Sequence, residues 1–137
     1  MAITANKHHS SYICATMETW ELDFQWLQLR HRLQTLTEAP NLPDLKAILF
    51  LIGVQEFGRV QESFSKEEKR DLIHVAACSL LESRDYYTFA GRDEDGWPHW
   101  EVNKPFNVKG LTEQETILRT AILEYFDKLN NEFDQEE

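Results

Sequence analysis

The spacing of apolar residues predicts a helix from about Thr19 to Thr37. Five apolar residues in this segment recur at intervals of four and three, which places them on one helical face. They are Leu22, Trp26, Leu29, Leu33 and Leu36. Phe24 and Leu27 are interpreted as widening the same face. Pro40 and Pro43 follow, and since proline cannot continue a helix, they end the pattern.

Two further helices are predicted in the middle of the chain. Residues 45–57 contain an unbroken apolar run, 47–54, whose side chains point all round a helical wheel. Residues 66–83 follow Ser65, which forms a capping box with Glu68. Because both segments are apolar over a wide arc, we expect these two central helices to be buried.

The pattern then changes to that of a β-hairpin at about 86–102. Aromatic and β-branched residues flank the turn-rich segment 91–96, which contains two glycines and three acidic residues. A last helix is predicted from 113 to about 130, after a second capping box at Thr112 and Glu115. The fold class is therefore mainly α with one β-hairpin, and its four helices follow the order α-α-α-β-β-α.

The same patterns predict how the chain is divided. Residues 1–16 are polar and are interpreted as an N-terminal arm, 17–131 as a single helical domain, and 132–137 as an acidic tail. The length of 137 residues agrees with one domain, and 42% hydrophobic residues suffice for a core.

The net charge of the chain limits the kinds of molecule that it is expected to bind. Fourteen Lys and Arg against 24 Asp and Glu give a net charge of −10, which argues against binding nucleic acid or an anionic membrane. No segment reaches the roughly 18 consecutive apolar residues of a membrane span. The two cysteines, Cys14 and Cys78, make no disulfide framework, and the N-terminus has no apolar signal stretch. We therefore expect a soluble cytoplasmic protein with a basic protein partner or a second copy of itself.

Glu56 is the most conspicuous polar residue, because it falls on the same helical face as Leu45, Leu49 and Ile52. A buried carboxylate must be paired, hydrogen-bonded or protonated, and such groups often mark a site. The alternative is that Glu56 reaches water near the helix end or pairs with Arg59. Consecutive helices usually pack side by side, so we also expect Glu56 to lie near His74 on the next helix.

Asp71, His74 and Cys78 share one stripe of the third helix and are the candidate metal ligands. A metal site needs three or four ligands, and no second ligand motif accompanies them, so no metal or other cofactor is expected. Cys78 with His74 also offers a thiolate pair, but both rise from one helix and point roughly parallel. No glycine-rich phosphate loop or nucleophile elbow occurs, which favours a non-enzymatic protein over an enzyme.

The hairpin supplies the candidate interaction residues Tyr86, Tyr87, Trp97 and Trp100, together with His99 as a further polar candidate. Tyr86 and Tyr87 point to opposite faces of a strand, so aromatic surface should remain outside the core. Trp20 and Trp26 add to this apolar surplus and favour a homodimer.

The segment 45–102 also resembles a winged helix-turn-helix in the order of its elements. Lys66, Lys69 and Arg70 begin the helix that would enter the DNA groove. The tip of the wing, however, would carry the acidic run 93–95, which repels phosphates.

These observations together favour a small non-enzymatic interaction or regulatory module that acts through protein–protein contacts. The first alternative is a small-molecule or metal-binding protein, including an enzyme, with its site around Glu56, His74 and Cys78. The second alternative is a DNA-binding winged helix, which rests on the order of the elements alone.

Overall fold

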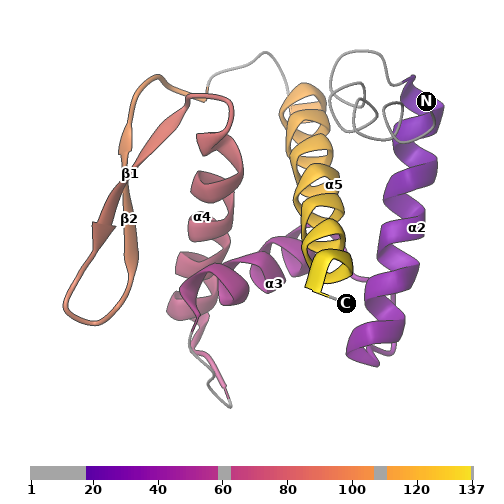
Figure 1. Ribbon diagram of the computed structural model, residues 1–137, viewed down its shortest axis with the longest axis horizontal. Helices are drawn as coiled ribbons and strands as arrows, with labels where there is room; N and C mark the ends of the chain where they lie inside the picture. The colour runs from indigo at the N-terminus through magenta and orange to yellow at the C-terminus, as the bar shows by residue number, and fades with distance from the viewer. Residues whose placement is uncertain (1–17, 59–62, 107–110, 137) are drawn as a thin grey trace. The chain divides into compact units, whose positions relative to one another are not determined.

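The computed structural model describes residues 18–58, 63–106 and 111–136, which form four helices and a two-stranded antiparallel sheet (Figure 1). The elements are α2 (Thr19–Thr37), α3 (Leu45–Phe57), α4 (Lys66–Glu82), β1 (Tyr87–Arg92), β2 (Pro98–Val102) and α5 (Leu111–Glu136). The predicted fold class and element order are confirmed. The predicted N-terminal arm, 1–16, lies outside the described residues.

The contacts divide the chain into two compact units. The first, which we call the two-helix unit, contains α2 and α5, and the second, the hairpin unit, spans 43–109 and contains α3, α4, β1 and β2.

The hairpin unit is built on the packing of α3 against α4. Both helices begin as the sequence predicts: Asp44 accepts a hydrogen bond from the amide of Ala47, and Ser65 and Glu68 form the complete capping box. Gly53 lies at the closest approach, where a Cβ atom would collide with the main-chain carbonyl of Leu72. Because glycine has no Cβ atom, the backbones of α3 and α4 come closer at Gly53 than any other residue at this position would permit.

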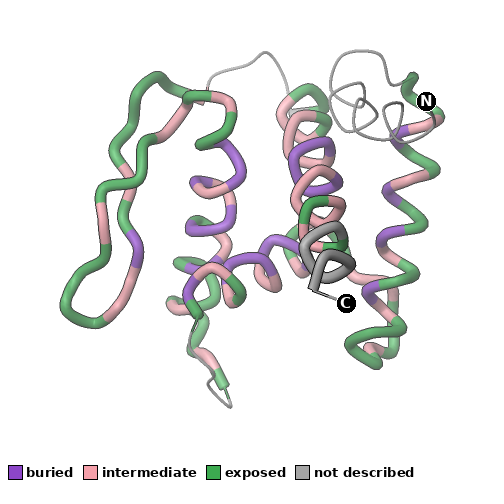
Figure 2. The backbone as a smooth tube through the Cα atoms, in the orientation of Figure 1, coloured by how far each residue is buried: buried purple, intermediate pink, exposed green. Residues whose placement is uncertain are grey.

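Both central helices are buried over much of their length, as predicted (Figure 2). Ile48, Ile52, Leu72 and Leu81 are among the largest fully buried side chains of the protein. The core of the hairpin unit therefore includes side chains of both helices, with Leu72 at the close approach to Gly53.

The hairpin packs on α4, with Phe89 opposite Trp100 in the strand register and an irregularity between Phe89 and Gly91. Its turn is held by Asp93, whose Oδ1 accepts from the amides of Asp95 and Trp97 at 2.9 Å each. The Asp/Gly turn signal in the sequence thus corresponds to a hydrogen-bonded loop.

In the two-helix unit, α2 packs against α5 through the face that the sequence predicts, except in the last turn of α2. Leu22, Trp26, Leu29 and Leu33 are buried, but Leu36, in the last turn, is 71% exposed. Trp26, which we counted as surplus apolar surface, is 5% exposed and so belongs to the core.

The last helix is longer than predicted. It begins at Leu111 rather than 113 and continues to Glu136, through most of the segment predicted as an acidic tail. Negative charge is unfavourable at a helix C-terminus, so an acidic end disfavours the helix. The segment contains neither proline nor glycine, however, and each added residue gains a hydrogen bond once a helix exists.

Candidate functional site

A small pocket of about 240 Å³ lies in the hairpin unit, between the end of α3, the end of α4 and the hairpin. Its lining residues are Glu56, Ser79, Glu82, Phe89, Arg92, Pro98 and Trp100. The pocket therefore brings together Glu56, the predicted polar candidate, and Trp100, one of the predicted interaction residues. Ser79, Glu82 and Arg92 were not anticipated, since on the sequence they read as ordinary surface positions.

Glu56 is half-buried in the last turn of α3, and its Oε1 accepts a hydrogen bond of 2.9 Å from the hydroxyl of Ser79 on α4. His74, by contrast, is exposed and lies with Nε2 3.5 Å from the sulfur of Cys78. The predicted pair of Glu56 and His74 stays a prediction. Arg59, the other predicted partner of Glu56, lies outside the described residues.

Arg92 joins the hairpin to the end of α3. Its Nη2 donates to the main-chain carbonyl of Glu56 at 2.7 Å, and its Nη1 donates to those of Phe57 at 3.1 Å and Gly96 at 2.9 Å. The last carbonyls of a helix have no partner within the helix and carry partial negative charge. The guanidinium of Arg92 thus acts as a cap on α3 supplied by the hairpin.

Glu82, Phe89 and Trp100 make another part of the pocket lining acidic and aromatic. The indole N–H of Trp100 donates to Glu82 Oε1 at 2.9 Å, which fixes both side chains. Trp100 also meets Phe89 edge to face, with 5.6 Å between ring centroids, and Phe89 is 48% exposed. A carboxylate beside two aromatic rings is an environment that suits a positively charged group.

Of the candidate metal ligands, His74 and Cys78 are in contact, but Asp71 does not complete a group of three with them. Asp71 and His74 are exposed, whereas Cys78 is buried, and burial raises the pKa of its thiol to about 11. At neutral pH the side chain is therefore a thiol, which is a poor nucleophile and a poor metal ligand. Within 18–58, 63–106 and 111–136, no three His, Cys, Asp or Glu side chains are grouped so that they could hold a metal ion.

His99 belongs to the hairpin turn and is not among the residues that line the pocket. Its Nε2 lies 2.8 Å from Oδ2 of Asp93. This hydrogen bond, followed by that from the amide of Trp97, lowers the pKa of the Asp93 carboxyl. The contact stabilises the local turn, and a binding role for His99 stays a prediction.

Three of the four predicted interaction residues take part in packing within the hairpin unit. Trp97 stacks on Phe57 with 4.2 Å between ring centroids, and Tyr86 packs edge to face with Phe106. Tyr87 is half-buried, and burial raises its pKa. Trp100 is the one of the four that lines the pocket.

The two-helix unit carries a second candidate surface, which we call the α2 stripe: Trp20, Phe24 and Leu27. These side chains are 68%, 57% and 43% exposed. Phe24 and Leu27 do not widen the buried face, because each lies two residues, or about 200°, from a buried leucine. The spacing of four and three from Trp20 to Leu27 is the signal that would have found this second face.

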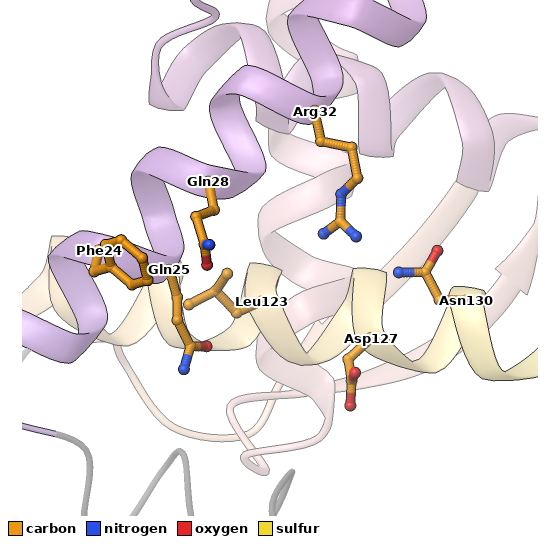
Figure 3. A pocket seen from close by; sticks show the side chains of 7 residues that line it. All are labelled: Phe24, Gln25, Gln28, Arg32, Leu123, Asp127 and Asn130. Carbon is orange, nitrogen blue, oxygen red and sulfur yellow. The ribbon is translucent and has the colours of Figure 1, made fainter.

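A groove of about 450 Å³ runs beside the stripe, between α2 and α5 (Figure 3). It is lined by Phe24, Gln25, Gln28, Arg32, Leu123, Asp127 and Asn130. Figure 3 shows Phe24 at one end of the groove and the longer polar side chains along it. Phe24 therefore belongs both to the α2 stripe and to the edge of a polar groove.

Comparisons with protein-family models, with curated proteins and with solved structures give no match for this chain. The function must therefore be argued from its own residues. In the part of the chain that the structure describes, no helix is both long enough and apolar enough to cross a membrane.

Proposed function

We propose that this protein is a non-enzymatic interaction module that works as a homodimer, with a second copy bound against the α2 stripe. The observation that carries the proposal is that α2 has two apolar faces. One face packs within the two-helix unit, and the other, formed by Trp20, Phe24 and Leu27, is exposed about 160° away round the helix axis. Burying a large apolar side chain contributes about 1.5–3 kcal/mol, which gives a strong drive to cover this stripe.

The charges on α2 favour a second copy as the occupant. On a helical wheel, Glu21 and Arg32 lie on one side of the stripe, while Asp23 and Arg30 lie on the other. Each side thus has an acid near the helix start and an arginine nearer its end.

An antiparallel second copy matches this pattern. It brings Glu21 opposite Arg32 of the other copy and Asp23 opposite Arg30, while Phe24 meets Leu27 across the centre. Such an interface is self-complementary, as a two-fold axis requires. The balanced charge of α2 also limits the repulsion expected between two chains of net charge −10.

The first experiment measures the mass in solution for the protein and for Phe24→Glu. We expect the unaltered protein to give twice the 16.1 kDa chain mass at about 100 µM, and Phe24→Glu to give the single-chain mass. Leu36→Glu is the matched control, because Leu36 is an exposed leucine on the same helix away from the stripe. A single-chain mass for the unaltered protein overturns the proposal.

A charge exchange tests the antiparallel arrangement. Glu21→Arg and Arg32→Glu should each weaken the dimer, because each leaves like charges opposite one another. The double variant should restore it, since the pairs re-form with their signs exchanged. In a parallel dimer the flank with Glu21 would face the opposite flank, which carries Asp23, so failure of the double variant to recover excludes the antiparallel form.

The order of the elements is the only observation that supports the winged-helix alternative. Asp93, Glu94 and Asp95 are all exposed at the hairpin tip, where a wing would meet phosphates. The metal-binding alternative has the contact between His74 and Cys78, but the described residues hold no group of three His, Cys, Asp or Glu side chains that could bind an ion.

A further inference from the structure

We infer that the pocket of the hairpin unit binds an organic cation: an ammonium or guanidinium group carried on an alkyl chain. The inference does not depend on the dimer, because every lining residue belongs to the hairpin unit and none to α2. It rests on three properties of the pocket: its charge, its aromatic wall and its size.

The charge of the pocket comes from two glutamates held in place by neighbours. Ser79 donates to Oε1 of Glu56, and Trp100 donates to Oε1 of Glu82. These hydrogen bonds orient the two carboxylates, and the one on Glu82 leaves its second oxygen, Oε2, to approach a ligand. Both carboxylates are therefore positioned before a ligand arrives, which lowers the entropy cost of binding.

Arg92 is the cation already present, and its bonds direct it toward the main chain. Its two terminal nitrogens donate to the carbonyls of Glu56, Phe57 and Gly96. The guanidinium thus compensates the carbonyl end of α3, while the lining as a whole keeps two carboxylates against one positive group. An anion would be repelled, and a cation would be attracted.

The aromatic wall selects an organic cation over a metal ion. Phe89 and Trp100 both line the pocket and meet edge to face at an interplanar angle of 67°, so their ring faces point in different directions. Ring faces attract alkylammonium and guanidinium groups, and tryptophan is the strongest of the aromatic partners. The same rings, with Pro98, offer apolar contact to the alkyl stem.

The size of the pocket limits the ligand to a small group. Its volume of about 240 Å³ is below the roughly 300–1,000 Å³ typical of sites for drug-sized molecules. The end of one lysine or arginine side chain fits such a volume, and so does a short free amine. Both sources share the same chemistry.

The experiment follows the indole N–H signal of Trp100 in two-dimensional NMR, identified by its loss in Trp100→Phe. The probes are n-butylammonium, N-acetyl-lysine methylamide, N-acetyl-arginine methylamide and the neutral N-acetyl-norleucine methylamide. We expect the three cations to shift the signal with dissociation constants of about 1 mM, and the neutral compound to leave it unchanged. Tighter binding of the amino-acid derivatives assigns the pocket to a partner's side chain, and tighter binding of butylammonium assigns it to a free amine.

Glu82→Gln should weaken binding about tenfold, because it removes one charge while keeping an oxygen that can accept from Trp100. Glu101→Gln is the control, since Glu101 is exposed on the adjacent position of β2 and points to the other side of the strand. The Trp97 indole signal and the circular dichroism spectrum establish that each variant is folded. Equal shifts with the neutral compound, equal loss in both variants, or no shift with any cation overturns the inference.

Discussion

The two units of the chain treat their apolar residues differently. In the hairpin unit, α3 and α4 approach each other at Gly53, and the hairpin adds Trp97 against Phe57. In the two-helix unit, α2 packs one face against α5 and leaves Trp20 exposed on the other. Two packed helices cover only one face of each other, so the second apolar face of α2, where we propose that a second copy binds, stays exposed in this unit.

The two units also differ in the polar contacts that their arginines make. Arg92 in the hairpin unit makes three hydrogen bonds of 2.7–3.1 Å to main-chain carbonyls. Arg119 in the two-helix unit lies 3.5 Å from both Asp23 and Glu115, with the carboxylates largely exposed, and such pairs contribute little. The hairpin unit is therefore expected to be the more rigid and the more sensitive to single substitutions.

The largest expected effect is that of Gly53→Ala. The added methyl group collides with the main chain of Leu72, which cannot move aside as a flexible side chain would. We expect the free energy of unfolding to fall by about 3 kcal/mol, measured by urea denaturation. Amide hydrogen exchange should rise more in α3 and α4 than in α2 and α5.

Gly58→Ala separates this collision from the general cost of replacing a glycine. Gly58 has a positive φ of 78° but no atom within 4 Å of an added Cβ. Its replacement should cost only about 1 kcal/mol. Equal effects at Gly53 and Gly58 would contradict the view that close packing distinguishes the hairpin unit.

Arg92→Met should have an intermediate effect. It keeps much of the apolar stem but removes all three hydrogen bonds to the carbonyls at the end of α3 and in the turn. We expect a loss of about 1–2 kcal/mol in the same denaturation experiment, since the site is partly exposed.

Arg119→Met is the matched change in the two-helix unit, where the arginine makes longer ion pairs and lies over the ring of Trp26. Its expected cost is below about 1 kcal/mol. A larger loss at Arg119 than at Arg92 would reverse the comparison between the two units.

The smallest expected effect concerns pH and the hairpin turn. The bond to His99 holds the pKa of Asp93 below its ordinary value, so the ionised carboxyl stabilises the fold. This contribution is complete above the unfolded-state pKa of about 3.9 and is lost as the pH falls through the lower, folded-state value. Asp93→Asn should remove this part of the pH dependence of the hairpin amide signals, whereas Glu94→Gln should keep it.

Much of the fold could be predicted from local sequence signals. Asp44, Ser65 and Gly58 mark helix ends through bonds and backbone angles made within a few residues, so the predicted bounds of α3 and α4 agree with the structure almost to the residue. The end of α5 could not be placed as well, because its last residues carry neither a stop signal nor an apolar face.

The candidate site was predictable only in part. Glu56 stood out because a carboxylate on an apolar face is locally anomalous. Its partner Ser79 is 23 residues away, and Arg92 reaches the carbonyl of Glu56 across 36 residues. No periodic pattern in the sequence predicts contacts between residues this far apart.

The sequence by itself determined which segments are helices and which form the hairpin, because caps, turns and apolar spacing act over a single turn or less. Only the tertiary structure decided that Phe24 and Leu27 lie outside the buried face of α2, since the extent of that face depends on where α5 packs. It likewise decided that Trp100 and Glu82 share a pocket with Glu56. Contacts between distant segments depend on how the backbones approach one another, as at Gly53, and local sequence rules carry no information about that approach.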